Sequence, residues 1–451
     1  MNRVIKRGHD IRLAGRPDDA VIDAPLPAAV AIKPPDFRGI IARPDVQPGD
    51  AVKVGSPLFH DKEHADFLFT APVSGTVAEV ERGARRAIQK VVVEPDGRQD
   101  ALALDPPALA SAGRGQVLDA LKRSGLLAAV TQRPLAVAPD PTVAPRDIFV
   151  PAMDTAPLAA DCAVLLRGAE DAFRTGLQAL SRLTEGHLHL CTDGTLELPE
   201  VENVDRLERH EFRGPHPAGN AGVHIHHIAP IANRTDAVWV CPLQGVILIG
   251  RLFEEGRLVP DIVVASTGTS APRHTHVRTV LGAPVQAVTG GLADHEARYI
   301  SGNPLTGSPV GPDGFLSFMD TSVTVLPEHD GHKLMGWAMP RLTTASRSRT
   351  FPSAWVPALF AGRDGFAATT ELHGGERAFI ATGIYREVLP MDVYPEFLMK
   401  SILADDIPEM EGLGIYELAE EDVALCEYIC PSKIRWQEIL RRGLDLIQRE
   451  A

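Results

Sequence analysis

QPGDAVKVGSPLFHDKEHADFLFTAPVSGTVAEVERGARRAIQKVVV, residues 47–93, is the stretch that decides the fold of the N-terminal part of this chain. It divides into two similar halves, each opened by a turn-forming cluster, PGD at 48–50 and PVSG at 72–75. Proline and glycine gather where a chain reverses direction. The segments between these turns predict short strands with one buried face, because their apolar residues mostly alternate with polar ones. These apolar residues are Val52, Val54, Leu58, Val77, Val80, Ile88, Val91 and Val93.

This pattern resembles the barrel-sandwich fold of lipoyl and biotinyl carrier domains. In lipoyl domains the modified lysine sits at an exposed hairpin tip, and Lys62 falls near that position here. Its neighbours His60, Glu63 and His64 do not match a lipoyl-attachment hairpin. The favoured interpretation is therefore a solvated turn lysine, and covalent modification is the alternative. The intact mass of the purified protein separates the two, since an unmodified mass excludes a carrier.

The size and charge of the chain limit its functions. With 451 residues it is too long for one ordinary hydrophobic core, so several domains are expected. The formal charge of −14, from 59 acidic and 45 basic side chains, argues against nucleic-acid binding. It also argues against direct adsorption to anionic lipid. No apolar run approaches the ~20 residues needed to cross a bilayer, so membrane association would require a protein partner.

The N-terminus and the cysteines indicate a cytoplasmic protein. The basic start of the chain is not followed by an apolar block, so no secretory signal is expected. The cysteines are odd in number and widely spread, which does not suggest a disulfide framework. They are Cys162, Cys191, Cys241, Cys426 and Cys430.

The middle of the chain predicts an α/β domain. A buried strand at 147–150 is followed by a helix at 168–186 and a second strand at 187–191. Strand, helix and strand over this length predict a parallel, right-handed crossover unit. Before it, residues 116–130 predict a helix, and 131–145, with four prolines and no periodicity, predict a loop.

The pattern changes after residue 258. A strand at 262–265 and short apolar segments at 276–280, 285–289 and 298–300, separated by glycine-rich turns, indicate a small β-grasp-like domain. The predicted segments are a lead-in at 1–26, a barrel-sandwich domain at 27–98, a Rossmann-like α/β domain at 99–252, a β-grasp domain at 253–330, an irregular connection at 331–375 and a helical domain at 376–451.

Seven motifs, in order along the chain, carry a resemblance to one family. They are KRGHDIRLAGRP (6–17), PLFHDK with FTAPVSGTV (57–77), FVPAMDTAPLAAD (149–161), LTEGHLHLC (183–191), HPAGNAGVHIHHI (216–228), ISGNPLTG (300–307) and EEDVALCEYICPSKIRW (420–436). On these motifs the chain resembles the NqrA family, whose members are subunits of the bacterial Na⁺-translocating NADH:quinone oxidoreductase. That family is similar to the C subunit of the Rnf complex and to the NADH-binding flavoprotein subunit of respiratory complex I.

The resemblance implies a place in a larger assembly. It implies a peripheral subunit on the cytoplasmic side of the bacterial inner membrane, held by the other subunits of the complex and especially by a membrane subunit. The complex pumps Na⁺ while it passes electrons from NADH to ubiquinone, and NqrA proteins are implicated in handling the quinone. Flavins and iron–sulfur centres lie in other subunits, so the chain alone is expected to have no catalytic activity.

Two departures from the wider relatives predict that this chain binds no flavin, no NADH and no iron–sulfur cluster by itself. The relatives carry a glycine-rich GGAGFP loop that lets the backbone approach a phosphate, whereas residues 131–137 here read TQRPLAV. A 4Fe–4S cluster needs four thiolates, and only Cys426 and Cys430 remain near the C-terminus. We interpret them as buried structural cysteines; a redox pair and a metal shared with a partner are the alternatives.

A histidine cluster is one candidate for quinone contact. His216, His224, His226 and His227 lie within twelve residues, and on a strand His224 and His226 would face the same side. No cysteine or acidic pair nearby completes a four-ligand zinc site, so no metal site is predicted. A hydrogen-bonding role that fixes the loop is favoured, and donation to a quinone carbonyl is the alternative.

Two loops that mix a cation with apolar groups, at 33–38 and 133–135, are the other candidates. The candidate quinone contacts are thus His224, His226, Lys33, Phe37 and Arg133. No catalytic residue is predicted, because Asp154 and Asp161 have no adjacent nucleophile or metal ligand and are better explained as turn and helix caps.

Two other classes of function remain as alternatives. One is a stand-alone flavin or NADH oxidoreductase, against which the missing glycine loop counts. The other is a lipoyl-like carrier domain fused to an interaction module. Co-purification with membrane subunits, together with loss of NADH:quinone activity when the chain is removed, would exclude both.

Overall fold

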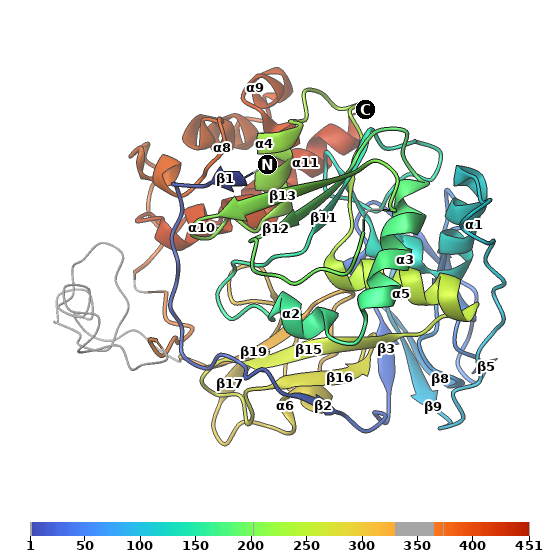
Figure 1. Cartoon of the computed structure of the whole chain (residues 1–451). Helices are drawn as coiled ribbons and strands as arrows, with labels where there is room; N and C mark the ends of the chain where they lie inside the picture. Colours follow the sequence, from blue (N-terminus) through green and yellow to red (C-terminus); the bar gives the residue numbers. More distant parts are fainter. Residues whose placement is uncertain (1, 202, 330–364, 373, 451) are drawn as a thin grey trace.

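The computed structural model describes residues 2–201, 203–329, 365–372 and 374–450. Its strands form four sheets, of six, six, four and three strands. Figure 1 shows the two six-stranded sheets one above the other, with the N-terminal β-module to one side and the C-terminal helices packed near the upper sheet. Most of the predicted connection at 331–375 lies outside the described residues.

The N-terminal β-module confirms the strands predicted around residues 47–93. One sheet has the order β3-β9-β8-β5 and the other β4-β6-β7, and every pairing within them is antiparallel. Val77, Val91 and Val93 are buried in the module, as the alternation predicted. The elements are β3 (Val30–Ile32), η1 (Pro34–Asp36), β4 (Ala42–Pro44), β5 (Ala51–Val52), β6 (Pro57–Asp61), β7 (Leu68–Thr70), β8 (Gly75–Arg82), η2 (Ala84–Arg86) and β9 (Ile88–Pro95).

The upper six-stranded sheet has the order β1-β13-β12-β11-β14-β10. Its neighbours run parallel except β10, which is antiparallel to β14. The parallel pairing of β11 with β12 confirms that the strands of the predicted crossover unit are parallel. The expectation of a plain loop at 131–145 was wrong, because β10 pairs with β14 at the sheet edge. The strands are β1 (Asn2–Val4), β10 (Thr131–Arg133), β11 (Asp147–Pro151), β12 (Leu188–Thr192), β13 (Leu207–Arg213) and β14 (Val238–Val240).

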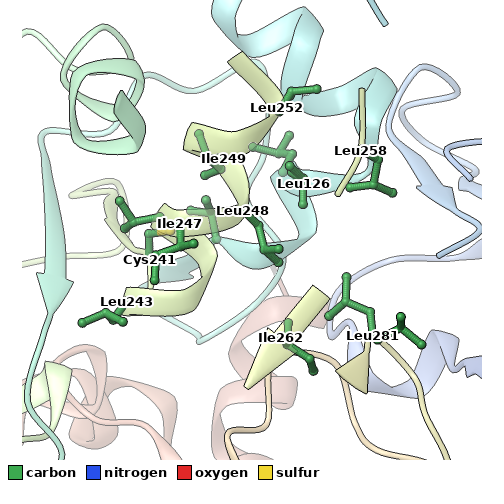
Figure 2. Packing of buried hydrophobic residues seen from close by; sticks show 14 of the residues in the cluster. Leu126, Cys241, Leu243, Ile247, Leu248, Ile249, Leu252, Leu258, Ile262 and Leu281 are labelled. Atoms are coloured by element: carbon green, nitrogen blue, oxygen red, sulfur yellow. The ribbon is translucent and has the colours of Figure 1, made fainter. Parts of the chain in front are cut away.

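Helices cover both faces of this sheet, which explains why residues 148–150 of β11 are all apolar. Ile148 and Val150 share a core with α3 and α5, whereas Phe149, between them, faces α4 and the C-terminal helices. Figure 2 shows the packing around α5, whose apolar side chains point in several directions. The helices are α1 (Arg114–Ser124), η3 (Leu126–Ala129), α2 (Cys162–Leu166), α3 (Glu170–Ser181), α4 (Ala221–Ile228) and α5 (Leu243–Glu255).

The lower six-stranded sheet has the order β18-β17-β19-β15-β16-β2 and is mixed. The segment at 285–289 is a helical turn, bounded by Pro284 and by Gly290 at a φ of +78°. The predicted lead-in at 1–26 supplies an edge strand to each large sheet, β1 above and β2 below. The elements are β2 (Val21–Asp23), β15 (Asp261–Thr267), β16 (His276–Val280), α6 (Val285–Thr289), β17 (Ala297–Ser301), β18 (Ser308–Pro309) and β19 (Ser322–Pro327).

The C-terminal segment contains short helices between residues 384 and 449. Helix α11 presents Leu440, Leu444 and Ile447 on one buried face, the spacing of an amphipathic helix. None of the described helices is both long and apolar enough to cross a membrane. The helices are η5 (Ile384–Glu387), α8 (Pro395–Leu403), α9 (Ile407–Gly412), η6 (Ile415–Glu417), α10 (Glu420–Ile429) and α11 (Trp436–Arg449).

Candidate functional site

A cleft of about 380 Å³ opens beside the carboxyl ends of β11 and β14. The chain leaves β11 toward β12 on one side and later returns as β14 on the other, so the strand order reverses between them. Ligands of open α/β sheets bind at such a reversal, where two loops diverge and leave a crevice. The topology of the sheet therefore marks this cleft as the candidate site.

The walls of the cleft come from both large sheets and from α10. Pro151 ends β11 and Met153 follows it, and Pro242 and Leu243 lead from β14 into α5. Asn220 precedes α4 and uses its side-chain amide to donate to the Glu421 carbonyl at 3.0 Å, which holds α4 against α10. The lower sheet contributes residues 302–307 and 319–322, and α10 contributes Glu421.

The charge in the cleft is acidic. Asp154, Asp320 and Glu421 line it, and its described lining residues include neither lysine nor arginine. Burial raises the pKa of Asp320 to about 6, although the Ser301 hydroxyl donates to its carboxylate at 2.5 Å. An acid with this pKa is partly protonated near neutral pH and can then donate a hydrogen bond.

One residue of the histidine cluster reaches the cleft. His216 lines its wall and shares a hydrogen bond of 3.1 Å between its Nδ1 and the Thr155 hydroxyl. Burial lowers the pKa of His216 to about 4, so its imidazole is neutral at physiological pH. A neutral imidazole can donate to, or accept from, an uncharged ligand.

His224, His226 and His227 lie on helix α4, not on the strand for which a shared face of His224 and His226 was considered. The sequence HIHHI imitates the two-residue period of a strand, but Gly222 lets the backbone of α4 approach α10 closely. A Cβ at Gly222 would lie 2.3 Å from an oxygen of Asp422. His224 and His226 consequently do not share a face, and their partners differ.

Each histidine of α4 fixes the helix to its surroundings. His224 is fully buried, with its ring 4.4 Å from that of Phe212 and its Nε2 2.9 Å from the Ala218 carbonyl. His226 places Nδ1 2.6 Å from a Glu417 oxygen, and His227 contacts the Pro390 carbonyl at 3.0 Å. These contacts are of the loop-fixing kind that was the favoured interpretation.

Lys33 and Phe37 lie together at the junction of the N-terminal β-module with the lower sheet. The Lys33 ammonium donates to the Phe315 carbonyl at 3.1 Å and to the Ser317 hydroxyl at 2.9 Å. The Phe37 ring packs 4.9 Å from the ring of Phe318. Neither residue lines the cleft, but both hold the segment that leads directly to Asp320.

Arg133 is buried one layer behind the cleft. Its guanidinium contacts Glu421 at 2.5 Å and Asp422 at 3.3 Å, and its side chain is 3% exposed. The structure thus brings Arg133 together with α10 and, through Asp422, with α4. It does not bring Arg133 together with Lys33 and Phe37.

Comparison with known proteins establishes the family to which this chain belongs. Over 99% of both chains, the sequence is 40% identical to the NqrA subunit of the Na⁺-translocating NADH–quinone reductase of Neisseria meningitidis serogroup A and 38% identical to that of Pasteurella multocida. The chain belongs to this family. Family models described as the NqrA N-terminal barrel-sandwich hybrid domain, the NqrA second alpha/beta domain and the NQRA C-terminal domain match residues 4–96, 112–258 and 263–311.

A weaker likeness exists to a solved NAD⁺-reducing [NiFe]-hydrogenase. The identity is 13% and the TM-score 0.40, over 77% of this chain and 63% of the hydrogenase chain. At this level the likeness adds nothing to the assignment of the NqrA family.

Other residues of this NqrA-family chain that its sequence singled out have structural partners. Asp161 caps α2 by accepting from the Ala163 amide, and Asp154 accepts from the Ala156 amide in a turn, as predicted.

Cys426 and Cys430 are fully buried, and Cys430 Sγ lies 3.1 Å from the Tyr385 hydroxyl. Cys430 follows the end of α10 rather than sharing its face with Cys426. Lys62 is exposed directly after β6.

Sequence reasoning missed Asp320 and Glu421 as cleft residues. Both come from segments far from β11 and β14 in the sequence, and only the packing of the lower sheet and α10 brings them there. The only sequence signal was the position of these residues relative to the matching motifs. Glu421 lies within the motif at 420–436, and Asp320 follows the motif at 300–307.

Proposed function

We propose that this chain is the peripheral, cytoplasm-facing NqrA component of a Na⁺-pumping NADH:ubiquinone reductase, bound to a membrane subunit of that complex. In this role it forms part of the path of ubiquinone and holds no flavin or iron–sulfur cluster of its own. The family assignment supports the first part of the proposal. The proposal also includes three finer fold assignments, which are a Rossmann-like upper sheet, a β-grasp lower sheet and a helical C-terminal domain.

The quinone assignment rests on one observation, which is that the described residues lining the cleft include no lysine or arginine. A quinone head group is uncharged and needs a flat apolar slot with hydrogen-bond donors for its carbonyls. Met153, Leu165, Leu243, Leu305 and Met319 supply apolar lining. His216 and protonated Asp320 supply candidate donors. A phosphate-bearing nucleotide is disfavoured, because three carboxylates and no described cation face it.

The segment that replaces the glycine-rich loop does not fit a flavin phosphate. The Gln132 amide donates to the Val137 carbonyl at 2.7 Å, and the Val137 amide donates back at 3.1 Å. Pro134, between them, has no amide hydrogen. The cation of this segment, Arg133, is engaged by Glu421 and Asp422 of α10, so its side chain is not available to hold a phosphate. This supports the proposal that the chain alone binds neither flavin nor NADH.

Photolabelling with a reactive ubiquinone analogue tests the quinone assignment on the full chain. Labels are expected in peptides that contain residues 151–156, 216–221 and 302–307. Labels confined to other peptides of this chain, or to other subunits when the whole complex is used, would contradict it.

Thr306→Trp is expected to weaken ubiquinone binding about tenfold or more, a loss of about 1.4 kcal/mol. Thr306 is exposed on the rim of the cleft, so an indole there narrows the entrance without entering a core. The dissociation constant can be measured by equilibrium titration with a short-chain ubiquinone. Ser308→Trp is the matched control, since Ser308 is exposed two residues away and does not line the cleft. Equal losses in both variants would remove the cleft as the binding site.

The affinity for ubiquinone is expected to rise as the pH falls through about 6. The neutral form of Asp320 donates a hydrogen bond to a quinone carbonyl, whereas its carboxylate repels the carbonyl oxygen. One such bond contributes about 0.5–1.5 kcal/mol, or roughly two- to tenfold in affinity. In Asp320→Asn the amide donates at every pH, so its affinity should change little between pH 5 and 8. A wild-type profile as flat as that of the variant would exclude Asp320 from the site.

A further inference from the structure

A second group of ionisable side chains lies on β12 and β13, between β11 and the edge strand β1 of the upper sheet. His189 on β12 is directly paired with Glu208 on β13, and His210 follows Glu208 by two residues. Residues two apart on a strand point to the same face, so the three side chains gather on one side of the sheet. This is the face that Phe149 shares, and the rings of Phe149 and His189 are 4.5 Å apart.

The distances among the three side chains are those of a ligand set. His189 Nδ1 and His210 Nε2 are 3.0 Å apart, and each lies 3.5 Å from Glu208 Oε2. Zn²⁺ bonds imidazole nitrogen and carboxylate oxygen at about 2.0–2.2 Å, which puts two tetrahedral ligands about 3.3–3.5 Å apart. We propose that His189, Glu208 and His210 bind one zinc ion, with the fourth position open to water.

Burial favours the ligand form of both imidazoles. The side chains of His189 and His210 are 3% and 7% exposed. Metal binding needs the neutral imidazole, whose lone pair is the ligand, and a buried position disfavours the charged form.

The surroundings of the three ligands resemble an outer shell. His187 Nδ1 lies 3.2 Å from Glu208 Oε1, the oxygen that faces away from the two imidazoles, and so orients the carboxylate. Asp147 Oδ1 lies 3.9 Å from His189 Nε2, on the far side of the ring from His210. Metal-bound imidazoles commonly have a carboxylate at this outer nitrogen.

The outer nitrogens of the two imidazoles lack hydrogen-bond partners within the described part of the chain. Among the described residues, His189 Nε2 and His210 Nδ1 have no hydrogen-bond partner. Both are the outer nitrogens of the imidazoles, so a lone hydrogen bond between the two rings leaves each ring with a buried, unpaired group.

The position of the site indicates a metal that fastens β12 to β13 and not one that serves the quinone cleft. His187 and Glu208 are 55% and 46% exposed, so an ion can enter from solvent. The cleft residues follow the carboxyl ends of the strands, whereas this cluster lies near their amino ends. We expected no metal site from the histidines at 216–227; the site proposed here uses different ones.

Zinc titration of the full chain tests the proposal. After dialysis against a chelator, the protein should take up one zinc ion per chain, measured by elemental analysis and by calorimetry. Co²⁺ in place of zinc should give the visible absorption of a tetrahedral site. Glu208→Gln should weaken zinc binding roughly tenfold or more, because it removes an anionic ligand from a half-exposed position.

Glu211→Gln is the matched control, since it makes the same change on the same strand but three residues away, on the other face. It should bind zinc as the unmodified chain does. The proposal is overturned if the unmodified chain takes up no zinc, or if both variants bind it equally well. In that event the two imidazoles form only a hydrogen bond to each other.

Discussion

Replacing Arg133 with methionine is expected to lower the free energy of unfolding by about 3–5 kcal/mol. The guanidinium is the cation that faces Asp422, which is fully buried, and it also contacts Glu421. Methionine fills similar space but leaves a buried carboxylate without its counter-ion. Urea denaturation followed by tryptophan fluorescence measures the loss, and loss of quinone affinity should accompany it, because Glu421 lines the cleft.

Two comparisons isolate the buried charge as the cause. Arg298→Met removes an arginine whose bond to Glu328 lies at the surface, so it should cost only about 0–1 kcal/mol. Adding Asp422→Asn to Arg133→Met should restore part of the stability, since an amide can still accept from the Ala419 amide as Asp422 does. A double variant no more stable than Arg133→Met would show that lost packing, not charge, dominates.

The defect of Arg133→Met should also depend on pH. Burial already raises the pKa of Asp422 to about 6, against the pull of Arg133. Without Arg133 that pKa rises further, while the unfolded chain keeps an ordinary aspartate pKa of about 3.9. Between these two values the folded variant holds a proton that the unfolded chain releases, so its stability falls as pH rises. The difference from the unmodified chain is therefore smallest near pH 5 and largest near neutrality.

Local periodicity predicted the elements whose buried faces can be recognised from the spacing of their own apolar residues. The strands of the N-terminal module alternate because each has one face in the core. Residues 148–150 of β11 are all apolar because helices cover both faces of that strand. The helix at 168–186 combined an apolar stripe with a following glycine. For these segments tertiary packing and local preference agree, which is why the sequence was sufficient.

The secondary-structure predictions were wrong where tertiary packing overrides the local sequence pattern. Residues 221–228 alternate like a strand, but Gly222 allows a helix to pack on Asp422. The first 26 residues have no strand signal, yet they supply β1 and β2, because an edge strand gains its hydrogen bonds from a sheet built elsewhere in the chain. The carboxylates of the cleft and the His189–His210 pair depend on such long-range pairing, so no window of sequence could join them.

Gly250→Val is expected to be the most disruptive small substitution in the upper layer, costing about 3 kcal/mol or more. A Cβ at Gly250 in α5 would lie 1.7 Å from the Ala172 carbonyl oxygen of α3, and one at Gly176 in α3 would lie 2.0 Å from the Val246 carbonyl oxygen. Both clashes are with backbone, so the two helices must separate. Because the first turn of α5 lines the cleft, the variant should also bind ubiquinone more weakly, measured by the same titration.

Gly115→Ala provides the control for helix propensity. Gly115 lies in the first turn of α1, where an added Cβ would have no neighbour within 4 Å, so alanine there meets no clash. The substitution should leave stability unchanged or raise it by up to about 1 kcal/mol, because alanine favours a helix more than glycine does. The contrast between the two sites follows from contact alone, since both glycines are helical. If Gly250→Val were as stable as Gly115→Ala, the close crossing of α3 and α5 would not determine the position of the cleft wall.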